Sequence, residues 1–333
     1  ISGDGSIAVV GALNYGTYAG AVYVFTRSGT TWTYRARLTA DDAANYDMFG
    51  GEDYQHAVKI NKTGTHVVVG APGDDDGNSG RGSAYVFVTA DGGVNWTQQQ
   101  KIAPSYTQGG SSQSFGNAVA FNNDATYMAI ASKNMRKNGH SSNAYRYGVV
   151  FVYTRTGSTW SEQGYFTPSD GAEDDNFGWH ISMNGAGDRI FVHSHYDDDT
   201  ATSSGSAYVF TRSGSTWSQA AKIIKASPVA SNYWGSHINC TEAGDIFVVV
   251  GEGQYVGANA GRVYVWKDNG TDGTSWSLVK TLTSANDTGV AYGFGDVYGY
   301  TRISRDGKVI VNTAGFAGPA PNGLGGRAYM FNT

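Results

Sequence analysis

Residues 205–217 read GSAYVFTRSGSTW, and residues 20–32 read GAVYVFTRSGTTW. Further copies are GSAYVFVTADGGVNW at 82–96, GVVFVYTRTGSTW at 148–160 and GRVYVWKDNGTDGTSW at 261–276, and the sequence closes on GRAYMFNT at 326–333. Near copies at a regular spacing are an internal repeat, and the repeat decides the architecture before any local propensity does.

Two columns of residues define the length of the repeat. The apolar column has intervals of 59, 61, 62, 57 and 63 residues and consists of Ile1, Ile60, Phe121, Met183, Cys240 and Ile303. The tryptophan column consists of Trp32, Trp96, Trp160, Trp217 and Trp276, and a buried ring there, for example at Trp217, would stabilise its repeat. We therefore divide the single predicted domain, residues 1–333, into six repeats: 1–48, 49–114, 115–176, 177–233, 234–293 and 294–333.

Each of the four complete repeats contains four short β-type runs. In the second repeat a tight turn at 61–64 precedes a β-branched run at 66–69, a longer loop leads to 84–87, and a Gly-rich hairpin enters the fourth run at Trp96. Four antiparallel strands per repeat, without helices, predict an all-β fold, a β-propeller of four-stranded blades. We count 22 strands, with three each in the first and last repeats, so six blades are favoured. Seven blades, the alternative, would need roughly 420 residues, and we expect this chain to be part of a longer one.

Composition excludes several other classes of protein. Charged residues make up 15% of the chain, against about 25% in an average globular protein, and 47 glycines with 13% aromatic residues argue against coiled coils and disorder. A net charge of −5 without a basic cluster makes nucleic acid an improbable partner. Apolar runs of four or five residues are too short to insert into a membrane. The single cysteine, Cys240, falls in the apolar column, so we expect a buried, inert thiol.

Two short motifs recur at fixed places in the repeat. The first run begins with Phe115-Gly116, Phe177-Gly178, Trp234-Gly235 or Phe294-Gly295, and the second run closes with Gly70-Ala71-Pro72 or the shorter Gly11-Ala12. This pattern resembles the FG-GAP repeat, the blade of the integrin α-subunit propeller and of many bacterial and phage surface proteins. The hairpin around Trp217 is similar to repeats in marine phage and bacterial structural proteins. The resemblance implies a propeller that binds ligands on the face carrying its long loops.

The family's calcium loop is missing from this sequence. Calcium requires six to eight oxygen ligands, and the turns between the first two runs, such as Lys62-Thr63-Gly64, are too short to supply them. We therefore expect no cofactor, although a divalent cation bound in another way stays open.

The loops between the second and third runs are the variable part of the repeat. They span 13–20, 73–82, 133–148, 196–205, 252–261 and 314–326. Loops on a rigid scaffold often carry function, and aromatic and small polar residues suit recognition of proteins or sugars. The candidate ligand-binding residues are Tyr15, Tyr18, Asp74, Asp75, Asp76, Tyr145, Tyr147, Tyr196, Asp198, Tyr255 and Phe316. The alternative is that these loops only cover the ends of the strands.

Acidic runs and one histidine pair add a weaker candidate site. Acidic runs at 41–42, 74–76, 173–175 and 197–199 would make the long-loop face negative, either as plain solvated loops or to capture a divalent cation. His193-Ser194-His195 replaces Gly-Ala-Pro in the fourth repeat, and alternate strand residues share a side. The metal candidates are His193, His195, Asp197 and Asp199, because imidazole and carboxylate can bind a transition metal. Otherwise these are polar residues at the end of a strand.

No recognisable catalytic motif is present. The sequence lacks the Gly-x-Ser-x-Gly elbow, the phosphate loop and the dinucleotide fingerprint. We therefore expect a non-enzymatic propeller outside a cell or on a virion, for adhesion to a host-surface protein, a neighbouring structural protein or a glycan. One alternative is a self-assembling coat or filament protein that pairs through the open edges of its incomplete terminal blades. The other is a secreted carbohydrate-active enzyme, which would need two carboxylates about 5 to 10 Å apart.

Overall fold

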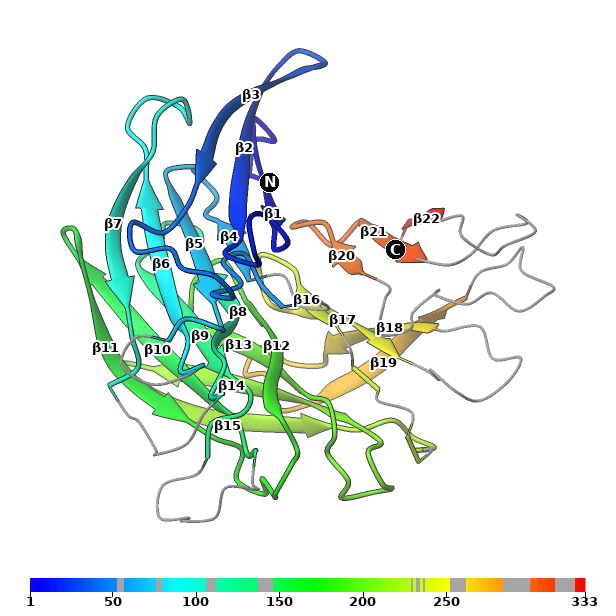
Figure 1. Cartoon of the computed structure of the whole chain (residues 1–333). Coiled ribbons are helices and arrows are strands. Elements are labelled where there is room, and N and C mark those ends of the chain that lie inside the picture. The colour runs from blue at the N-terminus through cyan, green and yellow to red at the C-terminus, as the bar shows by residue number, and fades with distance from the viewer. Residues whose placement is uncertain are drawn as a thin grey trace, which may run out of the picture. The chain divides into compact units, whose positions relative to one another are not determined.

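The computed structural model of the chain (Figure 1) describes residues 1–52, 57–75, 80–105, 112–136, 146–228, 230–231, 234–235, 237–251, 262–283, 300–314 and 327–332. The chain forms two compact units, Ile1–Thr167 and Pro168–Thr333, and each unit contains three antiparallel sheets. Across the described ranges, no helix is long and apolar enough to cross a membrane.

The first unit contains blades 1 to 3. Blade 1 consists of β1 (Ile7–Ala12), β2 (Ala21–Ser28) and β3 (Thr31–Leu38), and blade 2 of β4 (Val58–Ile60), β5 (His66–Ala71), β6 (Ser83–Val88) and β7 (Thr97–Ile102). Blade 3 consists of β8 (Phe115–Phe121), β9 (Tyr127–Ser132), β10 (Val149–Thr156) and β11 (Thr159–Phe166). In each sheet the strands pair in chain order.

The second unit contains blades 4 to 6. Blade 4 consists of β12 (Phe177–Met183), β13 (Arg189–Ser194), β14 (Ser206–Ser213) and β15 (Thr216–Ile223), and blade 5 of β16 (His237–Cys240), β17 (Ile246–Gly251), β18 (Arg262–Asp268) and β19 (Trp276–Leu282). Blade 6 consists of β20 (Thr301–Ile303), β21 (Val309–Ala314) and β22 (Arg327–Asn332). The described residues thus confirm the all-β propeller with six blades rather than seven, the first and last of them three-stranded.

Burial falls from the middle strands of a blade to its last strand. Residues 67–71 of β5 and 83–87 of β6 are all buried, whereas most of β3 is exposed. Blades of one unit pack face to face, with β8 against β4 and β5, and β16 against β12 and β13. Both faces of a middle strand are therefore covered, which explains why β-branched and aromatic residues follow one another there without polar gaps.

The two halves of the recurring motif lock successive blades together. Gly82 has a φ of +84°, and a Cβ at this position would collide with the backbone oxygen of Phe115. A Cβ at Gly70 would likewise collide with the backbone oxygen of Gly116. The Phe-Gly pair that begins one blade therefore sits directly on the glycines of the blade before it, where no side chain fits.

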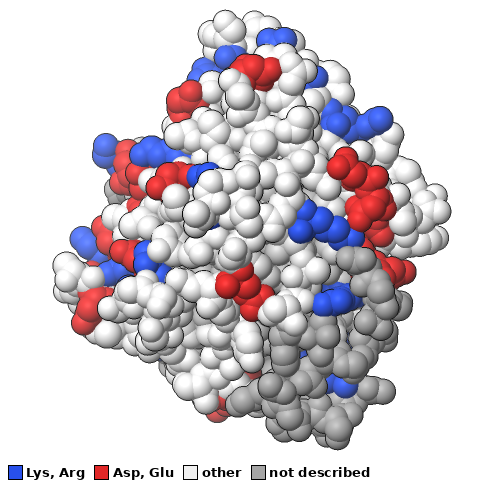
Figure 2. Space-filling model, turned by 90° about the vertical axis from the view of Figure 1, so that its left-hand side faces the viewer, with Lys and Arg blue, Asp and Glu red and all other residues white. Residues whose placement is uncertain are grey.

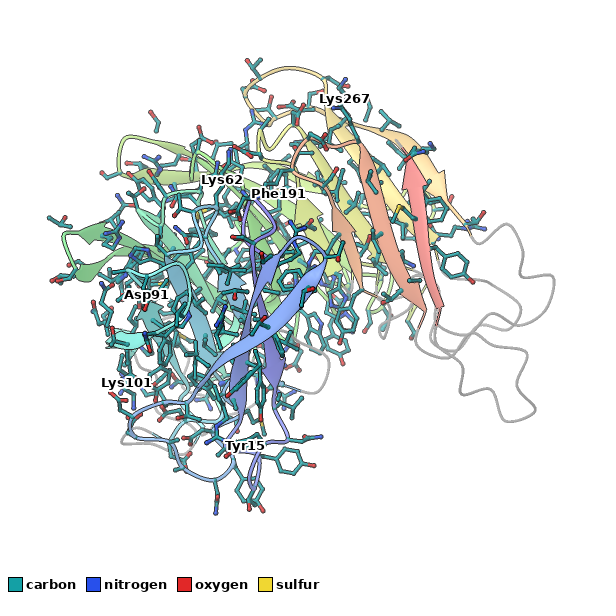
Figure 3. All side chains as sticks on the ribbon, turned by 90° about the horizontal axis from the view of Figure 1, so that it is seen from above. Tyr15, Lys62, Asp91, Lys101, Phe191 and Lys267 are labelled. Carbon is teal, nitrogen blue, oxygen red and sulfur yellow. The ribbon has the colours of Figure 1, made fainter. Side chains whose placement is uncertain are left out.

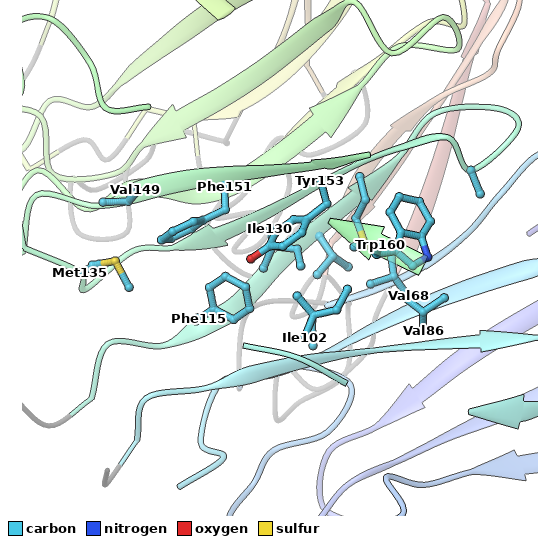
Figure 4. Close-up of a cluster of buried hydrophobic side chains, with 14 residues drawn as sticks. Val68, Val86, Ile102, Phe115, Ile130, Met135, Val149, Phe151, Tyr153 and Trp160 are labelled. Atoms are coloured by element: carbon cyan, nitrogen blue, oxygen red, sulfur yellow. The ribbon is translucent and has the colours of Figure 1, made fainter. Parts of the chain in front are cut away.

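The core between blades 2 and 3 (Figure 4) contains one member of the tryptophan column. Phe115 and Phe151 meet edge to face with ring centroids 5.3 Å apart, and Trp160 is only 3% exposed within the same cluster. Trp217 is half-buried and Trp32 is 41% exposed. The column is therefore not uniformly buried, and Trp217 fills less core than a fully buried ring would.

Candidate functional site

The short-hairpin face, which carries the turns between strands one and two and between strands three and four, is fastened by a repeated arginine. In blade 3 the Arg155 Nε donates to the Ala125 oxygen (2.6 Å), and its Nη1 donates to the Gly157 oxygen (2.8 Å). Arg27 and Arg212 make the same pair of bonds in blades 1 and 4. The guanidinium joins the two turns of a blade, which gives the repeated segment Thr-Arg-Ser-Gly, or Thr-Arg-Thr-Gly in blade 3, a structural role.

The opposite, long-loop face carries the loops between strands two and three and the connections between blades. In the first unit, the connection 44–49 pairs with the loop 15–20. The backbone N–H groups of Tyr46 and Met48 donate to the oxygens of Thr17 and Tyr18, both at 2.9 Å. The Gly73 N–H donates to the Asp47 oxygen at 3.1 Å, which adds the next loop. Hydrogen bonds between main-chain atoms thus fix the position of this surface.

Three tyrosines project from this surface, and we call Tyr15, Tyr18 and Tyr46 the tyrosine platform. Their side chains are 37%, 43% and 58% exposed, respectively. The rings of Tyr18 and Tyr46 are nearly parallel, with an interplanar angle of 11° and centroids 6.0 Å apart. The Arg37 guanidinium lies over the Tyr15 ring at 4.6 Å. Figure 3 shows Tyr15 pointing away from the ribbon on the same side as Lys101, with Lys62 on the other side.

Two platform residues have a backbone conformation that disfavours large side chains. Tyr18 and Tyr46 have φ values of 56° and 70°, in the left-handed region. Tyr18 lies two residues before the glycine that precedes β2. The residues at the matching positions of blades 2 and 4 are Gly80 and Ser203, which also have positive φ values. Tyr46 lies three residues before the aromatic residue of the Phe-Gly pair, where later blades have Ser112, Asp174 and Ser231 in left-handed conformations. Small polar residues or glycine meet this backbone requirement, so folding does not explain the two tyrosines.

Beside the platform, a lysine and a tyrosine hold two aspartates. The Lys101 Nζ lies 2.6 Å from Asp42 Oδ2 and 3.1 Å from Asp74 Oδ2, and the Tyr85 hydroxyl donates to both carboxylates at 2.9 and 2.5 Å. Burial opposes the charge on Lys101, but the hydrogen bonds from the two carboxylates outweigh burial and raise its pKa. Asp74 is buried in this cluster and is therefore part of the scaffold rather than an exposed ligand contact.

Blade 4 repeats the arrangement with one more carboxylate. The Lys222 Nζ lies 2.8 Å from Asp170, 2.8 Å from Asp197 and 2.6 Å from Asp199, and the Tyr208 hydroxyl donates to Asp197 at 2.7 Å. The lysine ammonium thus occupies the centre of the acidic cluster predicted from the sequence. Asp175 lies nearby, where burial first, then the charges of the aspartates at 197–199, raise its pKa to about 6.

The two histidines pack against neighbouring residues of blades 4 and 5. His193 is fully buried, its Nε2 lies 3.0 Å from the Trp234 oxygen, and a Cβ at Gly235 would collide with its ring. His195 stacks on Trp179 at 4.2 Å between ring centroids. Burial lowers the pKa of His193 to about 3. Among the described residues, no group of three or more His, Cys, Asp or Glu is placed to hold a metal ion, so His193, His195, Asp197 and Asp199 are not gathered into such a site.

The remaining candidates are scattered. Asp75 and Asp198 are exposed, Tyr196 is half-buried against Trp179, and Tyr147 is buried. Asp76, Tyr145, Tyr255 and Phe316 lie outside the described residues. Sequence reasoning missed Tyr46, although it follows the acidic run at 41–42 on a connection assigned to the same face. It also missed Arg37 and Lys101, which lie on strands.

The charged residues are mixed rather than segregated. On the face drawn in Figure 2, basic and acidic side chains are interspersed, and most of the surface is uncharged. No single sign of charge therefore dominates the described part of that face.

The match to a known family falls on the two segments that carry these clusters. The model of the FG-GAP repeat matches residues 32–87 and 160–210, which contain the carboxylates and tyrosines of both lysine-centred clusters. The chain is a β-propeller that contains FG-GAP repeats. Sequence comparison with curated proteins gives no match.

Two solved structures share the fold of this FG-GAP propeller. One, described as a "putative 6-phosphogluconolactonase" from Bacteroides fragilis, is 13% identical with a TM-score of 0.59, covering 93% of this chain and 74% of its own. Another with the same description, from Bacteroides uniformis, is 13% identical with a TM-score of 0.56, covering 93% and 75%. At this identity the likeness concerns the fold alone.

Proposed function

We propose that this FG-GAP propeller is a non-enzymatic binding module whose tyrosine platform is the recognition surface. The observation that carries the proposal is the placement of two exposed tyrosines at left-handed positions where other blades have Gly80, Ser203, Ser112, Asp174 and Ser231. Strained backbone tends to persist where function requires it, and tyrosine supplies a large contact area at low entropic cost.

The carboxylates held by the two lysines, one cluster in each unit, support binding over hydrolysis. Asp42 and Asp74 are held by Lys101, and Asp170 and Asp197 by Lys222. A glycosidase needs one protonated and one free carboxyl group facing its substrate, whereas each of these four accepts hydrogen bonds from a lysine and a tyrosine. The arrangement therefore favours a rigid scaffold for the neighbouring loops.

The location that suits this role is outside a cell or on a virion, and we include it in the proposal. The support is the resemblance of the repeats to those of bacterial and phage surface proteins. Immunogold labelling of intact cells and particles with an antibody to this chain tests it, and signal confined to the cytosol would contradict it.

Self-assembly is a second candidate, supported by apolar side chains on the terminal strands. Val10 on β1 is 52% exposed and Met330 on β22 is 73% exposed, and exposed edge strands invite pairing with another chain. Light scattering across a concentration series tests this candidate. A strictly monomeric species at every concentration would contradict it.

An array of immobilised polysaccharides and cell-surface proteins tests the binding role. We expect at least one immobilised molecule to retain the native chain, and we expect the Y15A/Y18S/Y46S variant to lose that retention. Tyr165 on β11 is 45% exposed, so Tyr165→Ala is a matched control away from the platform and should retain binding. Equal binding by the platform variant and the native chain would overturn the proposal.

A further inference from the structure

The size of the tyrosine platform limits the kind of ligand it can hold. A tyrosine side chain presents about 200 Å², so exposures of 37%, 43% and 58% leave roughly 300 Å² of aromatic surface on the three residues. A stable protein interface needs about 800 Å² on each partner, centred on well-packed anchors. The platform is too small for that and matches a few rings of a small or linear ligand.

The shape of the platform surface suits a ligand with flat apolar faces. Tyr18 and Tyr46 lie within 11° of parallel, and the neighbouring exposed residues Gly16, Ala43 and Ala44 have little or no side chain. A sugar ring has one face of C–H groups that packs on an aromatic ring and an equator of hydroxyls that needs polar partners. The rim supplies those partners in the exposed side chains of Asn14, Thr17 and Asn45, which can all both donate and accept hydrogen bonds.

The charge around the platform is close to balanced. The segments 14–18 and 41–46 contain two charged residues, Asp41 and Asp42, and Asp42 is paired with Lys101 at 2.6 Å. The Arg37 guanidinium over Tyr15 offsets Asp41 in the local sum. A polyanion would meet two carboxylates, and a cationic peptide would meet Arg37 and Lys101. An uncharged ligand avoids like-charge repulsion from either set of side chains.

We propose that the tyrosine platform binds an uncharged glycan, with sugar rings stacked on Tyr18 and Tyr46 and hydroxyls bonded to the polar rim. This inference rests on the proposed binding function and names the chemistry of the ligand. It requires no cation and no covalent step, because stacking and hydrogen bonds between neutral groups supply the contact.

Affinity electrophoresis of the full chain tests the inference. Native gels contain one uncharged polysaccharide (a β-glucan, a dextran or a mannan) or one charged polysaccharide (alginate or heparin). We expect at least one uncharged polysaccharide to retard the chain, and 0.5 M NaCl to leave the dissociation constant unchanged within twofold in a parallel titration, since neutral contacts are not screened. We expect Y18S/Y46S to weaken binding at least tenfold. These serines are the residues found at the matching positions of blades 4 and 3, so the variant should fold.

The controls separate this inference from the proposed function. Tyr165→Ala should bind like the native chain, and Y18F/Y46F, which keeps both rings, should lose less affinity than Y18S/Y46S. Retardation by charged polysaccharides alone, or by none, would overturn the glycan inference. Capture of a protein through the platform would overturn the glycan inference while supporting the binding function. Polysaccharide binding that survives Y18S/Y46S, in a variant with native thermal unfolding, would overturn both.

Discussion

Tyr18 and Tyr46 are large residues in a backbone conformation that is unfavourable for large side chains. A left-handed conformation costs a large L-residue roughly 1–2 kcal/mol, and the two side chains offset part of this through their stacked rings, a contact of about 0.5–1.5 kcal/mol. Serine and glycine adopt the same backbone at lower cost in the other blades. The platform thus exposes an aromatic surface and slightly lowers the stability of blade 1.

We predict that Y18S/Y46S leaves the free energy of unfolding within about 1 kcal/mol of the native value, or raises it. The reason is that relief of backbone strain compensates for the lost ring contact. Urea unfolding followed by tryptophan fluorescence measures the difference. A loss above about 2 kcal/mol would mean that the tyrosines belong to the fold rather than to a recognition surface.

Glycines 29 and 82 provide a matched pair with similar φ values but different surroundings. At Gly29, with a φ of +60°, nothing lies within 4 Å of an added Cβ, whereas at Gly82 the Phe115 backbone occupies that position. We predict that Gly29→Ala costs about 1 kcal/mol and that Gly82→Ala costs at least about 3 kcal/mol. Urea unfolding of both variants checks this. Similar costs would contradict the interlocking of blades through the Phe-Gly pair.

At the scale of single elements, the arginine of the repeated hairpin joins two turns. The Arg155 guanidinium donates to the oxygens of Ala125, Gly157 and Asp124. We predict that Arg155→Ala lowers the free energy of unfolding by about 1–3 kcal/mol, because it removes charge-assisted hydrogen bonds to carbonyl groups. Arg155→Lys should recover only part of this, since an ammonium lacks the planar fork. If Lys restored full stability in thermal unfolding, the charge rather than the fork would be responsible.

The strands could be predicted from sequence because their signals are local. A turn such as 61–64 and the β-branched run after it lie within a dozen residues and repeat six times. The lysine-centred clusters could not be predicted in the same way. Lys101 and Asp42 are 59 residues apart along the chain and meet only once blade 2 has packed on the connection before it.

The candidate site was predicted in part, for the same physical reason. Tyr15 and Tyr18 were found because they lie in a variable loop, but Tyr46 acquires its role only through pairing of the connection 44–49 with that loop. The run at 74–76 appeared as one acidic cluster, yet Asp74 is buried and Asp75 is exposed. His193 resembled a metal ligand because strand alternation was visible in the sequence, whereas Trp234, which covers it, comes from the next blade.

At the scale of the whole molecule, buried imidazoles should make the fold sensitive to acid. Burial lowers the pKa of His193 to about 3, against hydrogen bonding to Trp234 and the charge of Asp197, which act in the opposite direction. In the unfolded chain this histidine has an ordinary pKa of about 6.5. Below pH 6.5 it therefore binds a proton in the unfolded chain but stays neutral in the folded chain. Stability from this group is therefore complete above pH 6.5 and declines as the pH falls towards 3.

We predict that His193→Gln reduces the loss of stability between pH 6.5 and pH 4, a loss of at most about 1.4 kcal/mol per pH unit for one group. Asp175 acts in the opposite sense, because its pKa, raised to about 6, favours the folded state as the pH falls below 6. Urea midpoints measured at several pH values check the prediction. In the first unit, burial lowers the pKa of His66 to about 4, so His66→Gln should change the pH profile in the same direction. An unchanged pH profile in the His193 variant would contradict it.

The central claim is that this propeller recognises its ligand on the long-loop face, at the tyrosine platform. Hydrogen-exchange mass spectrometry of the full chain, with and without the uncharged polysaccharide that retards it, tests the claim most directly. We predict that added protection is confined to residues 14–20 and 41–49, whose main-chain hydrogen bonds lie directly beneath the platform. Protection over the hairpins at 27–31 and 155–159, with none over 14–20 and 41–49, would place the ligand on the opposite face and contradict the account.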